Sequence, residues 1–158
     1  MRERIEVRQP PEAAFEALAD FSTSVEWDPG VARATRVRDG ADSPSGVGAE
    51  YELTVVFRGR SSEMRYSTTT YEPPRLVVLE GTGPQIQATD TIELAPLPSG
   101  GTLITYTADL RLTGVAKLAQ PLLGGAFTEM GRRALAGMHA WFDAAGPDQM
   151  PEPEGETS

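Results

Sequence analysis

Hydrophobic and polar residues alternate along most of this chain with the two-residue period of half-buried β-strands. Near the start, Ile5 and Val7 share one parity, and the charged residues Arg4 and Glu6 occupy the other. Turns that contain glycine or proline separate the later runs, a spacing that is typical of consecutive antiparallel strands. The pattern therefore predicts seven strands, at residues 2–8, 31–38, 49–58, 60–71, 75–80, 86–95 and 102–112.

Two segments between the first and second strands have helical signals instead. Residues 11–21 begin with a proline, which is compatible with the first turn of a helix, and apolar residues then recur at helical steps. Thr23 and Glu26 have the spacing of a capping box, which predicts a second, short helix that ends at Trp27.

A long helix is predicted after the last strand, because the apolar period changes to three and four residues through about residue 145. Pro121, Gly124 and Gly125 lie in its first turns and predict a kink or a break there. We expect residues 1–146 to form one domain and the acidic residues 147–158 to form a disordered tail. The apolar positions of the helix are Leu123, Phe127, Met130, Ala134, Met138 and Trp141.

Asp90 is the main exception to the polar and apolar alternation. Within residues 86–95 it shares the parity of Ile92, which places its carboxylate on the inward face. Burial raises the pKa of a carboxyl group, a change that suits a general acid or base, and Tyr66 and Tyr106 are candidate partners. The alternative is that a bulge reverses the parity, so that Asp90 is a structural residue near the rim.

The composition excludes several kinds of site. The 158 residues contain no cysteine and a single histidine, His139, so a disulfide scaffold, a thiolate or multi-histidine metal site and a cysteine nucleophile are all excluded. We expect neither a metal nor a cofactor. Arg58, Arg60 and Arg65 lie at a hairpin tip or on the outward parity, so no basic group is evident in the interior.

The charge and the hydropathy bear on partners and location. The formal net charge of −9 disfavours nucleic acid and anionic lipid surfaces as partners. The first residues lack an apolar stretch of signal-peptide length, and no window is long and apolar enough for stable membrane insertion. We therefore expect a cytoplasmic protein, either a monomer or a homodimer.

Five stretches of the sequence resemble the polyketide cyclase/dehydrase branch of the START-like (SRPBCC) superfamily. The resemblance implies an α+β helix-grip fold of the START/Bet v 1 type, in the order β-α-α-β6-α. In this fold a curved seven-stranded antiparallel sheet surrounds a long C-terminal helix and leaves an apolar cavity. Members of the family bind lipids, sterols, hormones or polyketides. The stretches are residues 9–21 (QPPEAAFEALADF), 27–31 (WDPGV), 71–76 (YEPPRL), 100–106 (GGTLITY) and 110–114 (LRLTG).

The inward parity and the expected cavity together give a candidate ligand-binding wall; the alternative is that the same side chains simply fill the core. Trp27 either closes the cavity mouth or covers the edge of the core. The candidate wall comprises Trp27, Tyr51, Leu53, Val55, Phe57, Met64, Tyr66, Ala88, Asp90, Ile92, Tyr106, Ala108, Phe127 and Met130.

Three functions are compatible with the sequence. The first is binding of a hydrophobic small molecule, such as a polyketide, a fatty acyl chain or an isoprenoid. The second is a cofactor-independent polyketide aromatase/cyclase or dehydratase, with Asp90, Tyr66 and Tyr106 as catalytic residues. An inward Asp90 favours this second function, although developing enolate charge would lack a cationic stabiliser. The third is a protein-interaction or accessory module, for which an exposed apolar patch would be the sign.

Overall fold

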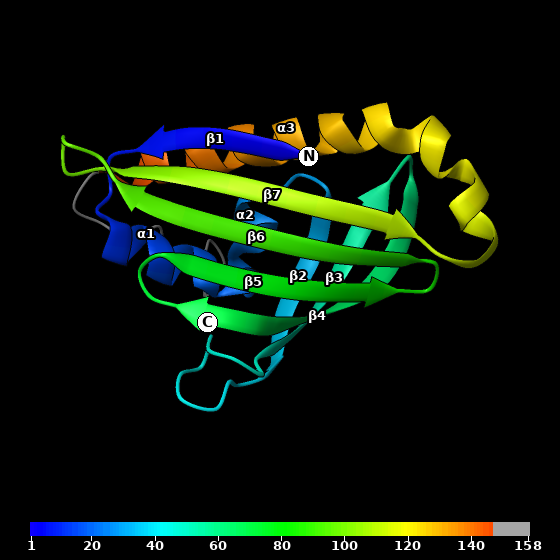
Figure 1. Ribbon diagram of the computed structural model, residues 1–158, viewed down its shortest axis with the longest axis horizontal. Coiled ribbons are helices and arrows are strands. Elements are labelled where there is room, and N and C mark those ends of the chain that lie inside the picture. The colour runs from blue at the N-terminus through cyan, green and yellow to red at the C-terminus, as the bar shows by residue number, and fades with distance from the viewer. Residues whose placement is uncertain (147–158) are drawn as a thin grey trace, which may run out of the picture.

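A single curved antiparallel sheet organises the structure, a computed structural model that describes residues 1–146 (Figure 1). Its seven strands lie in the order β1-β7-β6-β5-β4-β3-β2, so the first two strands of the chain form the two edges. The strands are β1 (Arg2–Val7), β2 (Val31–Arg38), β3 (Glu50–Phe57), β4 (Arg60–Glu72), β5 (Leu76–Gly83), β6 (Ile86–Pro96) and β7 (Thr102–Leu112).

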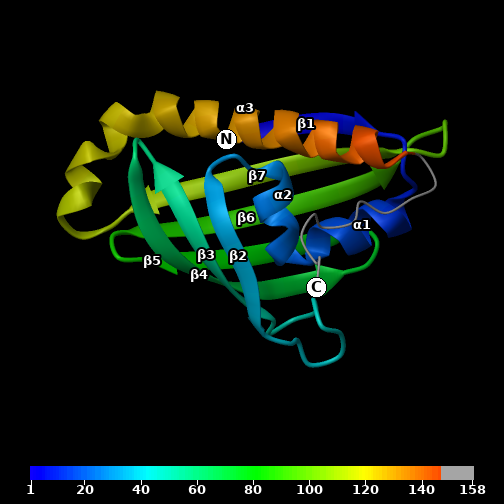
Figure 2. The ribbon, with the colours of Figure 1, turned by 180° about the vertical axis from the view of Figure 1, so that it is seen from behind.

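The helices lie on one side of this sheet. β2 and β3 run steeply across the direction of β5 to β7, so the sheet curls, and α3 lies along the edge strand β1 (Figures 1 and 2). α3 also packs against α2 and β7. The helical elements are α1 (Pro11–Ala19), the 3-10 turn η1 (Phe21–Thr23), α2 (Ser24–Trp27), the 3-10 segment η2 (Gly114–Ala119) and α3 (Gln120–Ala145).

These elements confirm the predicted order of strand, two helices, six strands and long helix. Strand ends differ from the prediction by a few residues, as is usual for boundaries. β5 had no predicted inward face, and the structure buries Val77, Leu79 and Gly81 there. None of the helices in residues 1–146 is both long and apolar enough to cross a membrane. The tail predicted for residues 147–158 lies outside the described residues.

The predicted capping box does not form, although the short helix α2 does. The side chain of Thr23 makes no cap at α2. Its hydroxyl group instead donates to the carbonyl of Ala17 at 3.0 Å and accepts from the indole N–H of Trp27 at 3.2 Å. Asp20 caps the preceding 3-10 turn by accepting from the backbone N–H of Ser22. Thr23 thus joins α1 to Trp27, a tertiary role that outweighs the local cap.

The predicted interruption of the long helix does not occur as a break. α3 is continuous from Gln120, with Pro121 in its first turn, and it curves through its early turns (Figure 1). A proline in the first turn removes no intrahelical hydrogen bond, so the helix continues through it. The change of conformation falls one residue earlier, between η2 and α3.

Two glutamine side chains fasten α3 to the sheet, one at each end. At the C-terminal end, the Nε2 group of Gln9 donates to the carbonyls of Phe142 and Gly146, at 2.6 and 2.7 Å. At the N-terminal end, Gln120 donates to the carbonyl of Leu110 at 3.1 Å and accepts from the backbone N–H of Leu112 at 3.0 Å. Both glutamine side chains form hydrogen bonds with backbone groups that have no partner in the sheet or the helix. These hydrogen bonds fix the position of α3.

α3 approaches α2 closely at Gly137. A Cβ atom at this position would overlap the carbonyl oxygen of Trp27. Because that oxygen belongs to the backbone, it cannot move aside without displacing α2. Trp27 is 1% exposed, and its ring packs edge-on against Phe21 and Tyr106, with centroids 6.2 and 6.0 Å apart. Gly137 therefore determines how closely α3 covers this part of the core.

We expect Gly137→Ala to destabilise the protein by about 2 kcal/mol or more, since the added methyl group overpacks the contact between α2 and α3. Gly125→Ala is the matched control in the same helix, where a Cβ atom would meet nothing within 4 Å. That substitution should raise stability by about 0.5–1 kcal/mol through helix propensity. Chemical denaturation of both variants measures the two effects. Equal stability of the two variants would contradict the close approach.

Candidate functional site

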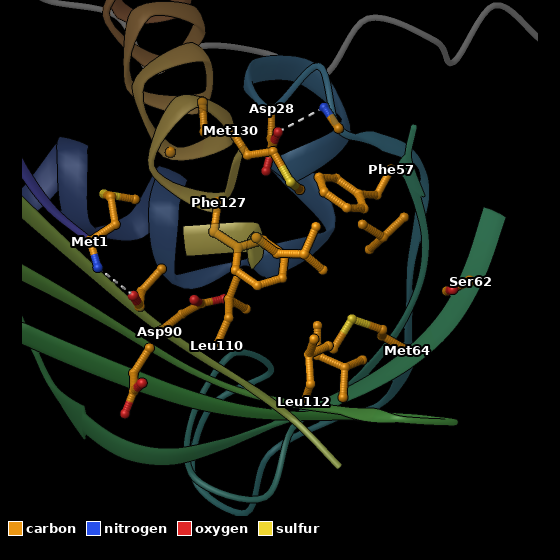
Figure 3. A pocket seen from close by; sticks show the side chains of 18 of the residues that line it. Met1, Asp28, Phe57, Ser62, Met64, Asp90, Leu110, Leu112, Phe127 and Met130 are labelled. Carbon is orange, nitrogen blue, oxygen red and sulfur yellow. Dashed lines mark hydrogen bonds between the residues drawn. The ribbon is translucent and has the colours of Figure 1, made fainter. Parts of the chain in front are cut away.

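A cavity of about 560 Å³ lies between the inner face of the sheet and α3 (Figure 3). The inward alternation of β3, β4, β6 and β7 supplies one wall, and the helical stripe of α3 supplies the other. Most of the lining is apolar, and the rings of Phe57 and Phe127 meet across it with centroids 5.5 Å apart. The two walls come from segments far apart in the chain, so the cavity exists only in the folded protein.

Ten of the fourteen predicted wall residues line this cavity in the structure. Alternation along each strand identified the inner face of the sheet. Part of that face, between β3 and α3, is not covered by other side chains and forms the cavity wall. The ten residues are Leu53, Val55, Phe57, Met64, Tyr66, Asp90, Tyr106, Ala108, Phe127 and Met130.

The other four predicted residues are packed in the core and do not reach the cavity. Trp27 covers the core beneath α2, and its indole N–H is used by Thr23. Tyr51 is completely buried and donates from its hydroxyl group to the carbonyl of Ala19 at 3.3 Å. Ala88 and Ile92 are 3% and 0% exposed on β6. Parity assigns each of the three strand residues to the correct face, but only packing decides which part of that face stays open.

Asp90 lies on the inner face of β6, with its carboxyl group on the cavity wall (Figure 3). Its neighbours across the sheet are Leu79 on β5 and Ala108 on β7, both apolar. Asp90 is 4% exposed, and burial raises its pKa from 3.8 to about 7. A carboxyl group of this kind exchanges a proton with a ligand near neutral pH, which an exposed aspartate does not.

Two tyrosine hydroxyl groups face Asp90. The hydroxyl groups of Tyr106 and Tyr66 favour its charged form, but they offset only part of the effect of burial on its pKa. Burial and the charge of Asp90 hold the pKa of both tyrosines well above 10, so both remain protonated donors. Tyr66 also approaches the sulfur of Met64, at 4.0 Å. The ring of Tyr66 occupies the place of a side chain at Gly81, where a Cβ atom would lie 2.6 Å from it.

Asp28 contributes a second carboxyl group to the cavity, and the sequence analysis missed it. Its Oδ1 accepts from the backbone N–H of Gly30 at 2.8 Å, which fixes the turn between α2 and β2. Burial nevertheless raises the pKa of Asp28 to about 6, and its negative charge further raises the pKa of Asp90. Aspartate before a proline and a glycine is ordinary turn chemistry, so no local signal distinguished this residue.

The cavity wall carries no basic side chain in the described residues. The lining includes Met1, whose α-ammonium group donates to the carbonyl of Ala108 at 3.0 Å. At the rim, Asp109 is paired with the exposed Arg111 at 3.2 Å. Neither Asp28 nor Asp90 forms a salt bridge with any described residue. Apart from the α-ammonium group of Met1, the charged groups that line the cavity are therefore all acidic.

One end of the cavity is bounded by η2 and the first turns of α3, which the predicted wall did not include. Gln120, Leu123 and Gly124 line the cavity here. The other side of this segment carries large apolar side chains that are almost fully exposed. They are Val115, Leu118 and Leu122, at 77%, 85% and 83% exposure. Exposed apolar residues are the feature that the interaction-module hypothesis requires.

Comparison with known protein families gives one match, over residues 1–142, to the family described as polyketide cyclase / dehydrase and lipid transport. A comparison with curated protein sequences finds no significant match.

Several solved structures share the fold at low sequence identity. The protein TTHA0849 from Thermus thermophilus is 17% identical, with a TM-score of 0.76 over 92% of this chain and 98% of that one. A START superfamily protein from Mycobacterium smegmatis is also 17% identical, with a TM-score of 0.70 over 89% and 96% of the two chains. The Zhui aromatase/cyclase from Streptomyces sp. R1128 is 14% identical, with a TM-score of 0.70 over 90% and 92%. These likenesses confirm the predicted START-like fold.

The raised pKa of Asp90 predicts a specific dependence of stability on pH. Between pH 4 and 7 the folded protein holds the Asp90 proton more tightly than the unfolded chain does, because the pKa rises from 3.8 to about 7. The carboxyl group therefore lowers stability as the pH rises through about 4 to 7. Asp90→Asn should remove this loss, so its gain in Tm over the wild type should be larger at about pH 8 than at about pH 5. One pKa unit corresponds to about 1.4 kcal/mol, so the total effect is on the order of a few kcal/mol.

Asp42→Asn is the control for this experiment, since Asp42 is exposed in the loop between β2 and β3. Between the two pH values, the difference in Tm from the wild type should change more for Asp90→Asn than for this variant. A difference for Asp90→Asn that is flat, or that falls as the pH rises, would show that the carboxyl group is not desolvated in the fold.

Proposed function

The chain belongs to the polyketide cyclase/dehydrase and lipid transport family, and from this premise we propose that it binds a hydrophobic small molecule in the cavity between the sheet and α3. The cavity itself carries the proposal. Its volume of about 560 Å³ falls in the range of small-molecule sites, and its wall is mainly apolar with a few convergent polar groups. Removing apolar ligand surface from water stabilises a complex by about 25 cal/mol per Å².

The small polar set would orient such a ligand. Tyr66, Tyr106 and Asp90 form one group on the sheet, and Asp28 approaches from the turn after α2. A ligand with an apolar body and one or two polar atoms fits this arrangement. Polyketide, fatty acyl and isoprenoid-like molecules all have such bodies.

A second candidate function is cofactor-independent acid/base catalysis on a carbonyl compound. The observation that favours it is the pKa of Asp90, about 7, beside two protonated tyrosines. The carboxylate of Asp90 would take a proton from the carbon between two carbonyl groups, and the electron pair would move onto a carbonyl oxygen. A tyrosine O–H would donate a hydrogen bond to that enolate oxygen. The aromatase/cyclase with the same fold supports this chemistry as a candidate.

Ligand binding is tested by thermal shift with farnesol, a fatty acid and an aromatic polyketide. We expect a saturable rise in Tm for at least one of them, because a ligand at about 100 times its Kd adds about 2.7 kcal/mol. Ala108→Phe should abolish the rise, since Ala108 lies on the cavity wall and a benzyl group there fills the ligand space.

Gln87→Phe is the matched control, because Gln87 is exposed on the outer face of the neighbouring strand β6. It adds the same aromatic ring outside the cavity and should leave the ligand response unchanged. The absence of any saturable rise in the wild type would refute binding in this cavity. A rise of the same size in Ala108→Phe would refute it equally.

Catalysis is tested by exchange of the acidic C–H protons of an alkyl-substituted 1,3-diketone with deuterium, followed by NMR. The wild type should accelerate the exchange, and Asp90→Asn should reduce the acceleration by about 10²-fold or more, the usual contribution of a general base. Binding of the neutral diketone should be retained. Exchange by the variant at the wild-type rate would remove Asp90 from the mechanism, whereas the binding function would stand.

A further inference from the structure

We propose that the cavity selects hydrophobic amines, and that the carboxyl groups of Asp28 and Asp90 attract the protonated nitrogen while the apolar wall holds the rest of the molecule. This inference rests on the proposed binding function and names its ligand class. It distinguishes this cavity from one suited to a fatty acid, whose head group is negatively charged.

The first argument is the sign of the charge inside the cavity. Two carboxyl groups face it, Asp90 from β6 and Asp28 from the turn between α2 and β2 (Figure 3). The wall has no lysine, arginine or histidine to balance them in the described residues. A carboxylate ligand would bring a further negative charge into a partly open, mostly apolar cavity, where repulsion is stronger than in bulk water.

The second argument is that both carboxyl groups lack a charged partner. Asp28 uses one oxygen to accept from the backbone N–H of Gly30, and no described arginine or lysine forms a salt bridge with either residue. Buried carboxylates are normally paired, because desolvation is costly otherwise. An ammonium group on the ligand would supply the missing charge and donate to a carboxylate oxygen.

The third argument is that the aromatic side chains facing the cavity favour a cation. The hydroxyl groups of Tyr66 and Tyr106 face Asp90, and the ring of Phe21 lines the cavity with its centroid 5.0 Å from that of Tyr66. Aromatic faces attract cations. The α-ammonium group of Met1 is the one positive charge among the described lining residues; it donates to the carbonyl of Ala108 and is outnumbered by the two carboxyl groups. Asp109 at the rim is paired with Arg111.

The dependence of binding on pH follows from these groups. Burial raises the pKa of Asp90 to about 7 and that of Asp28 to about 6, so both are increasingly protonated below neutrality. A bound ammonium group favours their charged forms. Affinity for an amine should therefore rise between about pH 5 and pH 8 as protons leave the pair, while affinity for a neutral ligand should change little.

The experiment compares three ligands with the same octyl chain by isothermal titration calorimetry, below the concentrations at which they form micelles. The ligands are octylamine, octan-1-ol and octanoate. We expect octylamine to bind about tenfold or more tightly than octan-1-ol at about pH 7.5, and octanoate to bind more weakly than both, as expected for charge pairs shielded from water.

Variants assign the selectivity to the two carboxyl groups. Asp28→Asn and Asp90→Asn should each reduce the preference for the amine by about fivefold or more, with octan-1-ol binding within about twofold of the wild type. Asp42→Asn removes one negative charge from the exposed loop and should leave the preference unchanged, which controls for general attraction to an acidic protein. The pH series on the unaltered protein gives the same information if a variant does not fold.

The outcomes separate this inference from the function on which it rests. Binding of octan-1-ol or octanoate as tight as that of octylamine would overturn the amine preference and leave hydrophobic binding intact. An amine preference that survives in both asparagine variants, or amine affinity that does not rise with pH, would also overturn it. Failure of all three ligands to bind the wild type would overturn the binding function as well.

Discussion

The cavity depends on one constraint, the fixed position of α3 across the opening of the curled sheet. Gln9 and Gln120 fasten the two ends of the helix to backbone groups, and Gly137 allows its middle to lie against the carbonyl of Trp27. A helix held at three points cannot sink into the sheet to fill the space beneath it. The C-terminal part of α3 therefore completes a solid core around Met138 and Phe142, while its N-terminal part covers an open cavity.

Into this space the fold places two carboxyl groups at a cost in stability. Burial raises the pKa of Asp28 and of Asp90, and the charge of Asp28 adds to the shift at Asp90. The hydroxyl groups of Tyr66 and Tyr106 near Asp90, and the hydrogen bond from the backbone N–H of Gly30 to Asp28, offset part of that cost. Functional sites typically contain groups that lower the stability of the ligand-free protein and that are stabilised by a bound ligand or proton. The acidic interior and the apolar wall thus support the same conclusion, a site for a molecule that is mostly hydrophobic and has a polar or cationic group.

The local pattern was sufficient where a side chain's role depends on its own strand or helix. Alternation in β6 placed Asp90 on the inner face, and alternation in β4 and β7 placed Tyr66 and Tyr106 on the same face. Local reasoning failed where a distant contact took precedence. Thr23 caps no helix because the carbonyl of Ala17 and the indole of Trp27 use its hydroxyl group.

By itself, the sequence determined the elements, their order and the face of each strand, because these follow from periodicity and turn chemistry within a few residues. Only the tertiary structure decided which inward residues line a cavity. Tyr51 and Ile92 have the same parity as their lining neighbours, yet both are sealed in the core. Only the tertiary structure showed that Asp28 lines the cavity. In the sequence it is an ordinary turn residue, and folding brings its carboxyl group to the same cavity as Asp90. The physical reason is that a cavity and the electrostatic potential inside it depend on how surfaces from segments far apart in the chain pack together. A local sequence pattern does not encode that packing.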